Sequence, residues 1–513
     1  MTVLIVNRYS FNKLIMLLLN CFILSIHCIS NEYLVQRQTI MDTEDQHATG
    51  GHAFLTSKES KANEILLQYK NQSISDGIEH PESYAPGMHF FNAKPLIDKS
   101  VIFRILKAMP KGSILHLHNS AAVSSRWVIK NLTYRSEAKL CDSEGKTIFT
   151  ARSFKSCSNG TLQNIPAMRL QNDSVQAFDL WLESLINLKL RESDLMYVDM
   201  NTIWVEFEQM FTVLKDFLGY KPFFEAYANR LLREFFEDNV MYLELRMSLS
   251  KLYDSDEKIY DEIEVVRTMA EIVKSFKEKN PDFIGAKVIF SKHRGMDSTV
   301  AQNYLKTYNR LKEEFPETVV GFDIVGQEDI NKPLSNFIDE LQQYKKSVSY
   351  YFHAGETNGY GNDADLNLID AVLLNSRRIG HGYALFKHPV LRKIVKSKGI
   401  ALEVCPISNQ VLRLLSDLRN HPAVSFVSEN LPLVISSDDP GFWDSIGVSY
   451  DFYYVFMAFA PRTAGIGFLK QIVWDSVRYS TLTSNERTSY AEILQQKWDN
   501  FIDAIIEGKY NQM

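Results

Sequence analysis

The strongest constraint on the fold is a regular alternation of short apolar runs with longer amphipathic stretches from residue 113 onward. The apolar runs cover residues 113–118, 240–245, 284–290, 319–324, 349–352, 378–380, 400–404 and 432–435. Eight such alternations predict eight βα units, whose parallel strands close into a (β/α)₈ TIM barrel. In that fold the functional side chains lie on the loops at the carboxyl ends of the strands.

Metal-binding residue types stand at the carboxyl ends of several runs. His116 and His118 end the first run, and alternate side chains of a strand leave by the same face, so both imidazoles should enter one pocket. A single His-x-His pair also occurs by chance, so the prediction depends on His353 after the fifth run and Asp438 after the eighth. Three neutral imidazoles and one carboxylate form a suitable Zn²⁺ shell with room for water. We therefore expect these four residues to bind Zn²⁺.

Three further residues near these positions are suited to proton transfer or substrate binding. Glu356 follows His353 by three residues, close enough to give a proton to the substrate without binding the metal. His381 stands between two glycines, which let the backbone approach closely, and suits a general base. Asp439, beside Asp438, can accept hydrogen bonds from the substrate. Each also has a purely structural interpretation. Glu356 could be a carboxylate at the start of a helix, His381 a turn residue, and Asp439 with Asp438 a capping pair before Pro440.

Other chemistries and partners are disfavoured by the sequence. Zinc deaminases of the cytidine type carry a Pro-Cys-x-x-Cys motif, whereas Cys405 and Pro406 have no second cysteine nearby. Neither a glycine-rich phosphate loop nor a Gly-x-Ser-x-Gly elbow occurs. The net charge of −6 argues against a general binder of nucleic acid or of membrane surfaces. A small substrate fits this chain better.

The first 30 residues are typical of an export signal. Arg8 and Lys13 supply positive charge, and the apolar run at 14–26 is shorter than the roughly 20 residues of a membrane span. We expect residues 1–30 to be removed and the protein to be secreted, with no membrane span afterwards. An uncut signal anchor is the alternative.

The cysteines and glycosylation sequons agree with export. Cys21 and Cys28 leave with the signal. Cys141 and Cys157 share a polar segment in which a disulfide can form, and Cys405 remains as a buried thiol. Glycosylation acceptors of the type Asn-x-Ser/Thr stand at Asn71, Asn131, Asn159 and Asn172. Each sequon alone is a frequent accident, but the group behind a signal favours a glycosylated surface.

The chain divides into an N-terminal arm, the barrel and an insertion. Residues 31–100 carry no catalytic signature and suit an arm that packs on the barrel or on a second subunit. The barrel spans 101–510, and its first two strands are separated by about 120 residues, which is far beyond an ordinary connection. The front of this inserted region is 120–183. Its rear carries three aromatic residues on one helical face, a spacing more typical of core packing than of substrate binding: Trp204, Phe207 and Phe211.

Several stretches around the candidate residues form a specific combination of motifs. They are MPKG at 109–112, HLH at 116–118, HAGET at 353–357, RIGHG at 378–382, EVCPISNQ at 403–410 and SSDDP at 436–440. Together they closely resemble the family of secreted adenosine deaminases, also called adenosine deaminase-related growth factors. The likeness extends over most of residues 85–505, including Trp204, the HR pair at 293–294 and GFDIVG at 321–326.

The resemblance implies hydrolysis of adenosine and 2′-deoxyadenosine to their inosine counterparts with release of ammonia. It implies the same four zinc ligands, Glu356 as the proton donor to the purine ring and His381 as the base. Substrate would be bound by Asp439, the backbone at Gly326, Trp204, Phe207, Phe211 and His293. It also implies a homodimer built through the arm. The insertion would be closed by a Cys141–Cys157 disulfide and would bind a cell-surface receptor or glycosaminoglycan, with growth-factor activity.

One position departs from the family pattern. The family usually has an aspartate directly after the second histidine, in contact with the ribose hydroxyls, and this chain has Asn119. An asparagine can still accept a hydrogen bond but lacks the charge of a carboxylate, so we expect weaker nucleoside binding with intact chemistry. This departure and the insertion motivate a second hypothesis, a signalling protein that uses the barrel as a binding scaffold. A third is a different hydrolase of the wider metal-dependent group.

Overall fold

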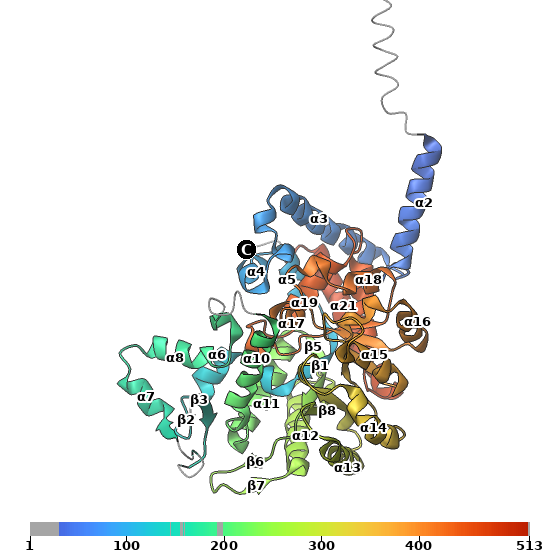
Figure 1. The fold of residues 1–513 in the computed structure, drawn as a ribbon. Coiled ribbons are helices and arrows are strands. Elements are labelled where there is room, and N and C mark those ends of the chain that lie inside the picture. The colour runs from blue at the N-terminus through green and yellow to red at the C-terminus, as the bar shows by residue number, and fades with distance from the viewer. Residues whose placement is uncertain (1–29, 144, 154–156, 158–159, 192–198, 511–513) are drawn as a thin grey trace, which may run out of the picture.

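The computed structural model describes residues 30–143, 145–153, 157, 160–191 and 199–510, and its centre is a (β/α)₈ barrel (Figure 1). Its strands form two parallel four-stranded sheets, with orders β1-β5-β8-β9 and β10-β11-β12-β13. The strands are β1 (Gly112–His118), β5 (Val240–Met247), β8 (Gly285–His293), β9 (Val319–Val325), β10 (His353–Ala354), β11 (Arg378–His381), β12 (Ala401–Val404) and β13 (Leu433–Ile435). The predicted fold class is therefore confirmed.

Two isolated bridges join the sheets into a closed ring. Leu117 of β1 pairs with Asp438 after β13, and Phe322 of β9 pairs with Tyr350 before β10. At the second seam Phe322 N donates to Ser349 O over 2.9 Å, and Tyr351 N donates to Phe322 O over 3.0 Å. Closure in this way leaves the barrel without a free sheet edge.

The fifth strand differs from the sequence prediction. The run at 349–352 was expected to be the strand, but β10 comprises His353–Ala354. The predicted run does lie between its neighbours, since Tyr351 N donates to Phe322 O and Arg377 N donates to Tyr350 O. At Phe352, however, the backbone N–H donates to the Ser376 hydroxyl over 3.2 Å, so a side chain interrupts the ladder. The strand register resumes only at His353.

Amphipathic helices surround the barrel. In α12 the buried residues Val265, Met269, Ile272 and Phe276 repeat at helical spacing, and Asp261 caps the first turn. The helices that follow the strands are α11 (Lys221–Glu237), α12 (Glu262–Lys279), α13 (Ser298–Glu314), α14 (Ile338–Tyr344), α15 (Asp363–Leu373), α16 (Pro389–Lys398), α17 (Pro406–Val411), α18 (Ala423–Ser428), α19 (Ser449–Tyr454) and α20 (Ile466–Arg478). Their apolar faces cover the outer surface of the sheet.

The predicted N-terminal helical arm is present. It comprises α2 (Asn31–His47), α3 (Ser57–Glu79) and α4 (Phe90–Ile97), and α5 (Val101–Ala108) then leads into β1. A capping box of Thr56 and Glu59 begins α3, and Glu59 also accepts a hydrogen bond from Trp498 of the last helix, α21 (Ser484–Ile506), over 2.8 Å. In contrast, α2 has no buried residue and projects from the body (Figure 1).

The insertion after β1 has its own small sheet. Strands β2 (Lys139–Ser143), β3 (Lys146–Thr150) and β4 (Thr161–Asn164) pair antiparallel in the order β3-β2-β4. Around them lie α6 (Ser125–Trp127), α7 (Ile165–Gln171) and α8 (Val175–Ser184), while α10 (Met200–Lys215) leads back to the barrel. The Cys141–Cys157 disulfide is present, and Cys405 is a buried free thiol. Both cysteine predictions are confirmed.

Some predictions fall partly on segments outside the described residues. The signal, with Cys21 and Cys28, lies there except for its last residue, and so does the sequon at Asn159. The sequon residues Asn131 and Asn172 are exposed, and Asn71 is half-buried. Within the described part of the chain, no helix combines the length and the apolar character needed to cross a membrane.

Candidate active site

Closure of the barrel places Asp438 against the two histidines of β1. His118 N donates to Asp438 O over 3.0 Å, and Asp438 N donates to His116 O over 3.3 Å. His353 in β10 pairs with the residue before His381, which ends β11. Four chain segments that are distant in sequence therefore deliver their polar side chains to the carboxyl end of the barrel.

The side chains of these residues meet in one buried cluster. Asp438 Oδ1 lies 3.2 Å from His116 Nε2 and 3.2 Å from His118 Nε2. His118 Nε2 is 3.4 Å from His353 Nε2, and His381 Nε2 is 3.7 Å from Asp438 Oδ2. Two sets of ligand atoms lie within 4.8 Å of one another, namely His116, His353, His381 and Asp438, and His118, Asp438 and Asp439.

Two residues of the cluster have left-handed backbone. His381 has a φ of 59° and Asp438 a φ of 60°. This region is uncommon for residues with a Cβ and costs about 1 kcal/mol or more for each residue. A glycine beside them is needed for space, because a Cβ on Gly380 would lie 3.0 Å from His116 Cε1. The surrounding barrel thus holds the cluster in a strained arrangement, as is common at functional sites.

Hydrogen bonds behind the cluster set the tautomers of two histidines. His116 Nδ1 lies 2.8 Å from Glu403 Oε2, and His353 Nδ1 lies 2.7 Å from Asp323 Oδ2. Each carboxylate accepts a hydrogen bond, so Nδ1 carries the proton and Nε2 turns its lone pair toward the cluster. Burial lowers the pKa of His353 to about 3, which keeps this ring neutral.

Two buried arginines hold these carboxylates in the barrel interior. Arg246 binds Asp323 over 2.7 Å and Glu403 over 2.5 Å. Arg378 binds Glu403 and Glu244, each over 2.6 Å. Burial alone would raise the pKa of Glu403, but the two guanidinium groups lower it well below its usual value. The result is a closed network of charges that stays ionised beneath the site.

The cluster has the properties of a divalent metal site. His116 Nε2 and Asp438 Oδ1 are buried and have no hydrogen-bond partner among the described residues. Unsatisfied buried polar atoms are costly, and a cation between them would satisfy both. Neutral imidazoles fixed by carboxylates, together with one ligand carboxylate, are a donor set that Zn²⁺ accepts. The residues present therefore fit a bound divalent metal.

Two further carboxyl groups border the cluster. Burial, followed by the charges of Asp438 and Glu328, raises the pKa of Glu356 well above its usual value. Burial and the adjacent Asp438 likewise raise the pKa of Asp439. Burial has the opposite effect on His381 and lowers its pKa well below the usual value. The site thus combines a carboxylic acid that keeps its proton with an imidazole that is neutral.

Asn409 of α17 lies between these two groups. Its Nδ2 is 3.4 Å from Glu356 Oε1 and 3.3 Å from His381 Nδ1. Its Oδ1 is 3.0 Å from His421 Nε2, while His421 Nδ1 accepts a hydrogen bond from Ala423 N over 3.0 Å. Because Nδ1 of His421 is the acceptor, Nε2 carries the proton and donates to Asn409 Oδ1. This fixes the amide with its NH₂ group toward Glu356 and His381.

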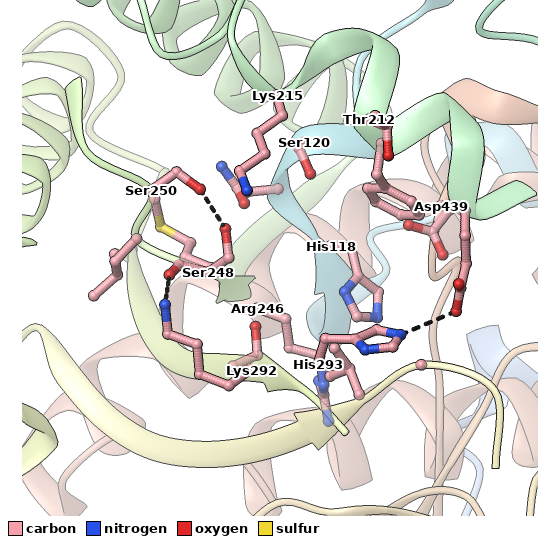
Figure 2. Close-up of a pocket in the computed structure, with 18 of the residues that line it drawn as sticks. His118, Ser120, Thr212, Lys215, Arg246, Ser248, Ser250, Lys292, His293 and Asp439 are labelled. Atoms are coloured by element: carbon pink, nitrogen blue, oxygen red, sulfur yellow. Dashed lines mark hydrogen bonds and ion pairs between the residues drawn. The ribbon is translucent and has the colours of Figure 1, made fainter. Parts of the chain in front are cut away.

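A cavity of about 710 Å³ opens above the cluster. Every residue expected to bind substrate lines it, together with most of the cluster. Figure 2 labels part of this wall, including His118, His293 and Asp439. The expected substrate-binding residues are Asn119, Trp204, Phe207, Phe211, His293, Gly326 and Asp439. His116 does not line the cavity, since its side chain is fully buried beneath it. The volume lies within the range of small-molecule sites.

Two features of the sequence lie in the cavity wall, the glycine at 326 and the aromatic residues of α10. Gly326 has a φ of 101°, and a Cβ there would lie 2.5 Å from His293 Nε2. His293 Nε2 in turn is 3.1 Å from Glu208 Oε1, a contact drawn in Figure 2. Phe207 contacts Trp204 and Phe211 edge to face, with ring centroids 5.3 and 5.2 Å apart. The aromatic face of α10 thus has a packing role and also faces the cavity.

The sequence reasoning assigned no role to the residues beneath and beside the cluster. These are Glu244, Arg246, Asp323, Arg378, Glu403, Asn409 and His421. A signal was available for Glu244, Asp323, Arg378 and Glu403, because each is a charged residue within a predicted buried run, where charges need partners. Arg246 lies one residue beyond the predicted run at 240–245. Asn409 and His421 gave no comparable signal, since their contact depends on tertiary packing.

Comparisons with known proteins identify the family of the chain. A family model described as adenosine deaminase matches residues 189–497, and one described as adenosine/AMP deaminase N-terminal matches residues 15–106. Adenosine deaminase 2-A of Danio rerio is 39% identical over 476 residues, which cover 91% of this chain and 93% of that protein. The adenosine deaminase of Phlebotomus duboscqi is 39% identical over 465 residues, covering 90% of each chain.

Solved structures with the same fold are more distant in sequence. The N6-mAMP deaminase of Arabidopsis has a TM-score of 0.55 and 18% identity, and the match covers 76% of this chain and 99% of that one. An amidohydrolase from Burkholderia ambifaria, solved with bound zinc, has a TM-score of 0.51 and 19% identity, with coverage of 79% and 95%. At this identity the likeness supports the fold alone.

Proposed function

The chain belongs to the adenosine deaminase family, and we propose that the cluster at the mouth of its barrel converts adenosine and 2′-deoxyadenosine to inosine and 2′-deoxyinosine with release of ammonia. It is an enzyme that hydrolyses adenosine. The observation that carries the proposed site is the position of Asp438 Oδ1, 3.2 Å from both His116 Nε2 and His118 Nε2, with His118 Nε2 a further 3.4 Å from His353 Nε2.

We assign these four residues as the ligands of a Zn²⁺ ion. The family is metal-dependent, and the fixed tautomers of His116 and His353 support ligand roles for both rings. When bound, zinc would act as a Lewis acid that lowers the pKa of a coordinated water toward about 7. The arginine and carboxylate network beneath the site keeps the two rings oriented for this purpose.

Glu356 and His381 divide the proton transfers between them. The raised pKa of Glu356, which follows first from burial, supports a carboxylic acid that donates its proton to the purine ring nitrogen. The lowered pKa of His381, again from burial, supports a neutral base that takes a proton from the attacking water at Nε2. For this role Nδ1 must carry a proton, and Glu356 Oε1 is an acceptor 3.4 Å away.

Asn409 is expected to position Glu356, and it acts on His381 only through that carboxyl group, because a protonated Nδ1 cannot accept from the Asn409 amide. Its amide donates to Glu356 Oε1, the oxygen that also accepts from His381, which leaves the other carboxyl oxygen for the substrate. Replacing Asn409 with Leu should lower kcat about tenfold, since a hydrogen bond to a charged or reacting group contributes about 1.5 kcal/mol or more. Metal content, measured by elemental analysis of the same samples, should not change. A variant with wild-type kcat would contradict the positioning role.

The purine and the sugar are held by the cavity wall. We assign Asp439 and the backbone at Gly326 to the purine, and Trp204, Phe207, Phe211 and His293 to the walls of the nucleoside pocket. Asp439 Oδ1 is buried without a partner among the described residues, which supports a hydrogen bond to substrate. The glycine is supported by the short approach of His293, which leaves no room for a side chain.

Asn119 should weaken ribose binding without loss of chemistry. It lines the cavity in the turn after β1, where the family usually has a carboxylate. Asn119→Asp would restore a charge-assisted hydrogen bond to the ribose hydroxyls and should lower the KM for adenosine about fivefold, with little change in kcat. Steady-state kinetics on both proteins test this. Zinc-loaded wild-type protein that leaves adenosine untouched, with turnover restored in the variant, would overturn the expectation of mere weakening.

We further propose that the enzyme is secreted and works outside the cell as a glycosylated homodimer. The disulfide of the insertion supports an oxidising compartment, and the exposed sequons Asn131 and Asn172 are accessible for modification. The absence of buried residues in α2, together with its exposed Val35 and Ile40, supports a second subunit on the arm of residues 31–100. The insertion at 120–183 is assigned to binding a cell-surface receptor or glycosaminoglycan, with growth-factor activity.

One assay tests the catalytic proposal. Secreted protein of known metal content is mixed with adenosine, and the ultraviolet absorbance change of its conversion to inosine is followed. Activity that a chelator removes and Zn²⁺ restores supports the proposal. Zinc-loaded protein that hydrolyses other amides or esters but not aminopurines would overturn it.

A further inference from the structure

The cavity above the metal cluster continues into a second part with a different character. Here the wall is formed by Lys215 at the end of α10, Lys292 on β8, and Ser248 and Ser250 after β5. Figure 2 shows these four residues around the region on the far side of His118 from Asp439. We propose, building on the proposed deaminase function, that this part is a subsite for a phosphate on the sugar of the substrate, so that adenosine monophosphates bind more tightly than adenosine.

The two lysines bring positive charge to the cavity. Among the described residues, neither ammonium group forms an ion pair with a carboxylate. Lys292 Nζ donates to the Ser248 carbonyl oxygen over 2.6 Å and lies 4.4 Å from the centroid of the Tyr304 ring. The pKa of Lys292 is lowered to about 8, mainly by burial; the charge of Glu262 opposes this shift and the charge of Lys215 contributes to it. Two cations that face one cavity repel each other, and an anion between them would relieve that repulsion.

The hydroxyl groups nearby suit a phosphate. Ser248 Oγ and Ser250 Oγ are 3.1 Å apart, and both residues line the same part of the cavity. A phosphate ester offers three strong acceptor oxygens, which match a set of ammonium and hydroxyl donors. The donors come from three different elements of the fold, so the subsite does not depend on the direction of any one helix.

The opposite end of the cavity sets the orientation of such a ligand. At that end the proposed function places Glu356 and Asp439, which would form hydrogen bonds with the purine base, and no lysine lines this part of the wall among the described residues. An adenine nucleotide therefore has one favourable orientation, with its base over the cluster and its phosphate between the lysines. In this orientation the amino group that leaves as ammonia lies at the metal, as in the reaction of adenosine.

Asn119 removes a charge that would disfavour this ligand. It lines the cavity together with Lys215 and Lys292, at the position where the family usually carries an aspartate for the ribose hydroxyls. A carboxylate there would repel a phosphate on the same sugar, whereas an amide does not. Asn119, which is expected to weaken adenosine binding, thus favours a nucleotide. Together with the two lysines it makes the cavity more suitable for an anionic substrate.

The test compares adenosine with adenosine 5′-monophosphate and adenosine 3′-monophosphate in the same ultraviolet assay. For the wild-type protein we expect a lower KM for at least one of the two monophosphates than for adenosine. Lys292→Met and Lys215→Met keep the apolar stem of each lysine and remove its charge. Each variant should lower the ratio of kcat/KM for that monophosphate to kcat/KM for adenosine about tenfold, the loss of one charge-assisted hydrogen bond. Lys274→Met, on the exposed face of α12, is the matched control and should leave this ratio unchanged.

Different results would refute the deaminase function and the phosphate subsite. No turnover of adenosine by zinc-loaded protein refutes the deaminase itself. Turnover of adenosine with a higher KM for both monophosphates, or a substrate ratio unaffected by both lysine variants, refutes only the phosphate subsite. If a lysine variant does not fold, the salt dependence of the wild-type enzyme decides. The KM of the monophosphate should rise with salt while that of adenosine stays constant, and equal salt dependence would refute the subsite.

Discussion

Glu356→Gln is expected to lower kcat for adenosine about a thousandfold while the protein still folds and binds its metal, because general acid catalysis contributes about 10²- to 10⁴-fold. Glutamine has the shape of the protonated acid and can still accept from Asn409, but it cannot give a proton to the purine ring. Its amide can still donate a hydrogen bond to the substrate, so the KM should change less than kcat. Absorbance kinetics and metal analysis on one preparation measure both quantities.

A matched control distinguishes loss of the acid from a general effect of removing a glutamate. Glu278 lies on the exposed face of α12, far in sequence from the cluster residues, and Glu278→Gln should retain full activity. The assignment of the acid would be wrong if Glu356→Gln retained more than about a tenth of the wild-type kcat, well above what loss of a general acid allows. Loss of bound metal in the same variant would instead point to a role for Glu356 in holding the ion.

The barrel and the position of its functional end could be predicted because both follow from local pattern. Short apolar runs separated by amphipathic helices permit few topologies, and connections in parallel sheets place the loops of interest at one end. Once His116, His118, His353 and Asp438 are seen to end four such runs, their convergence follows from the fold. No measurement of side-chain distance is needed for that step.

Other features of the site depend on closure and could not be predicted from local pattern. The left-handed backbone of His381 and Asp438 arises where the chain must leave a strand and turn its side chain inward. The bridge between Leu117 and Asp438 joins the first and last strands, which are separated by more than 300 residues. The interrupted ladder at Phe352 has a similar origin, since it depends on a side chain that follows the next helix.

The charged residues inside the barrel could be predicted only in part. Asp323 and Glu403 lie in runs that the sequence identifies only as buried strands, and Arg246 directly follows another such run. The pattern of apolar residues does not show which of these charges pair. A charge within a buried strand nonetheless requires a partner of opposite sign. The presence of such a network could therefore have been inferred from the sequence, but its use in orienting the metal ligands needed the structure.

Glu403→Gln should have the largest effect on stability and on the metal together. Glu403 is fully buried, and its two oxygens accept from Arg246, Arg378 and His116. A glutamine side chain would turn an NH₂ donor toward one of these donors and leave positive charge uncompensated. Breaking a buried ion pair in this way costs about 3–5 kcal/mol of unfolding free energy. Loss of the acceptor for His116 Nδ1 should in addition weaken metal binding about 10- to 100-fold. Urea unfolding and zinc competition titrations measure the two effects separately.

Glu244→Gln separates the two roles of this network. Glu244 is also fully buried and binds Arg378 over 2.6 Å, but its other oxygen accepts from Thr481 N. None of its hydrogen bonds within the described part of the chain goes to a metal-site histidine. Its substitution should lower the free energy of unfolding by a comparable amount and change zinc affinity much less. If both variants bound zinc as tightly as the wild type, the hydrogen bond from His116 to Glu403 would contribute to stability alone. If both lost zinc equally, the loss would follow from a general loosening of the barrel and not from the orientation of one imidazole.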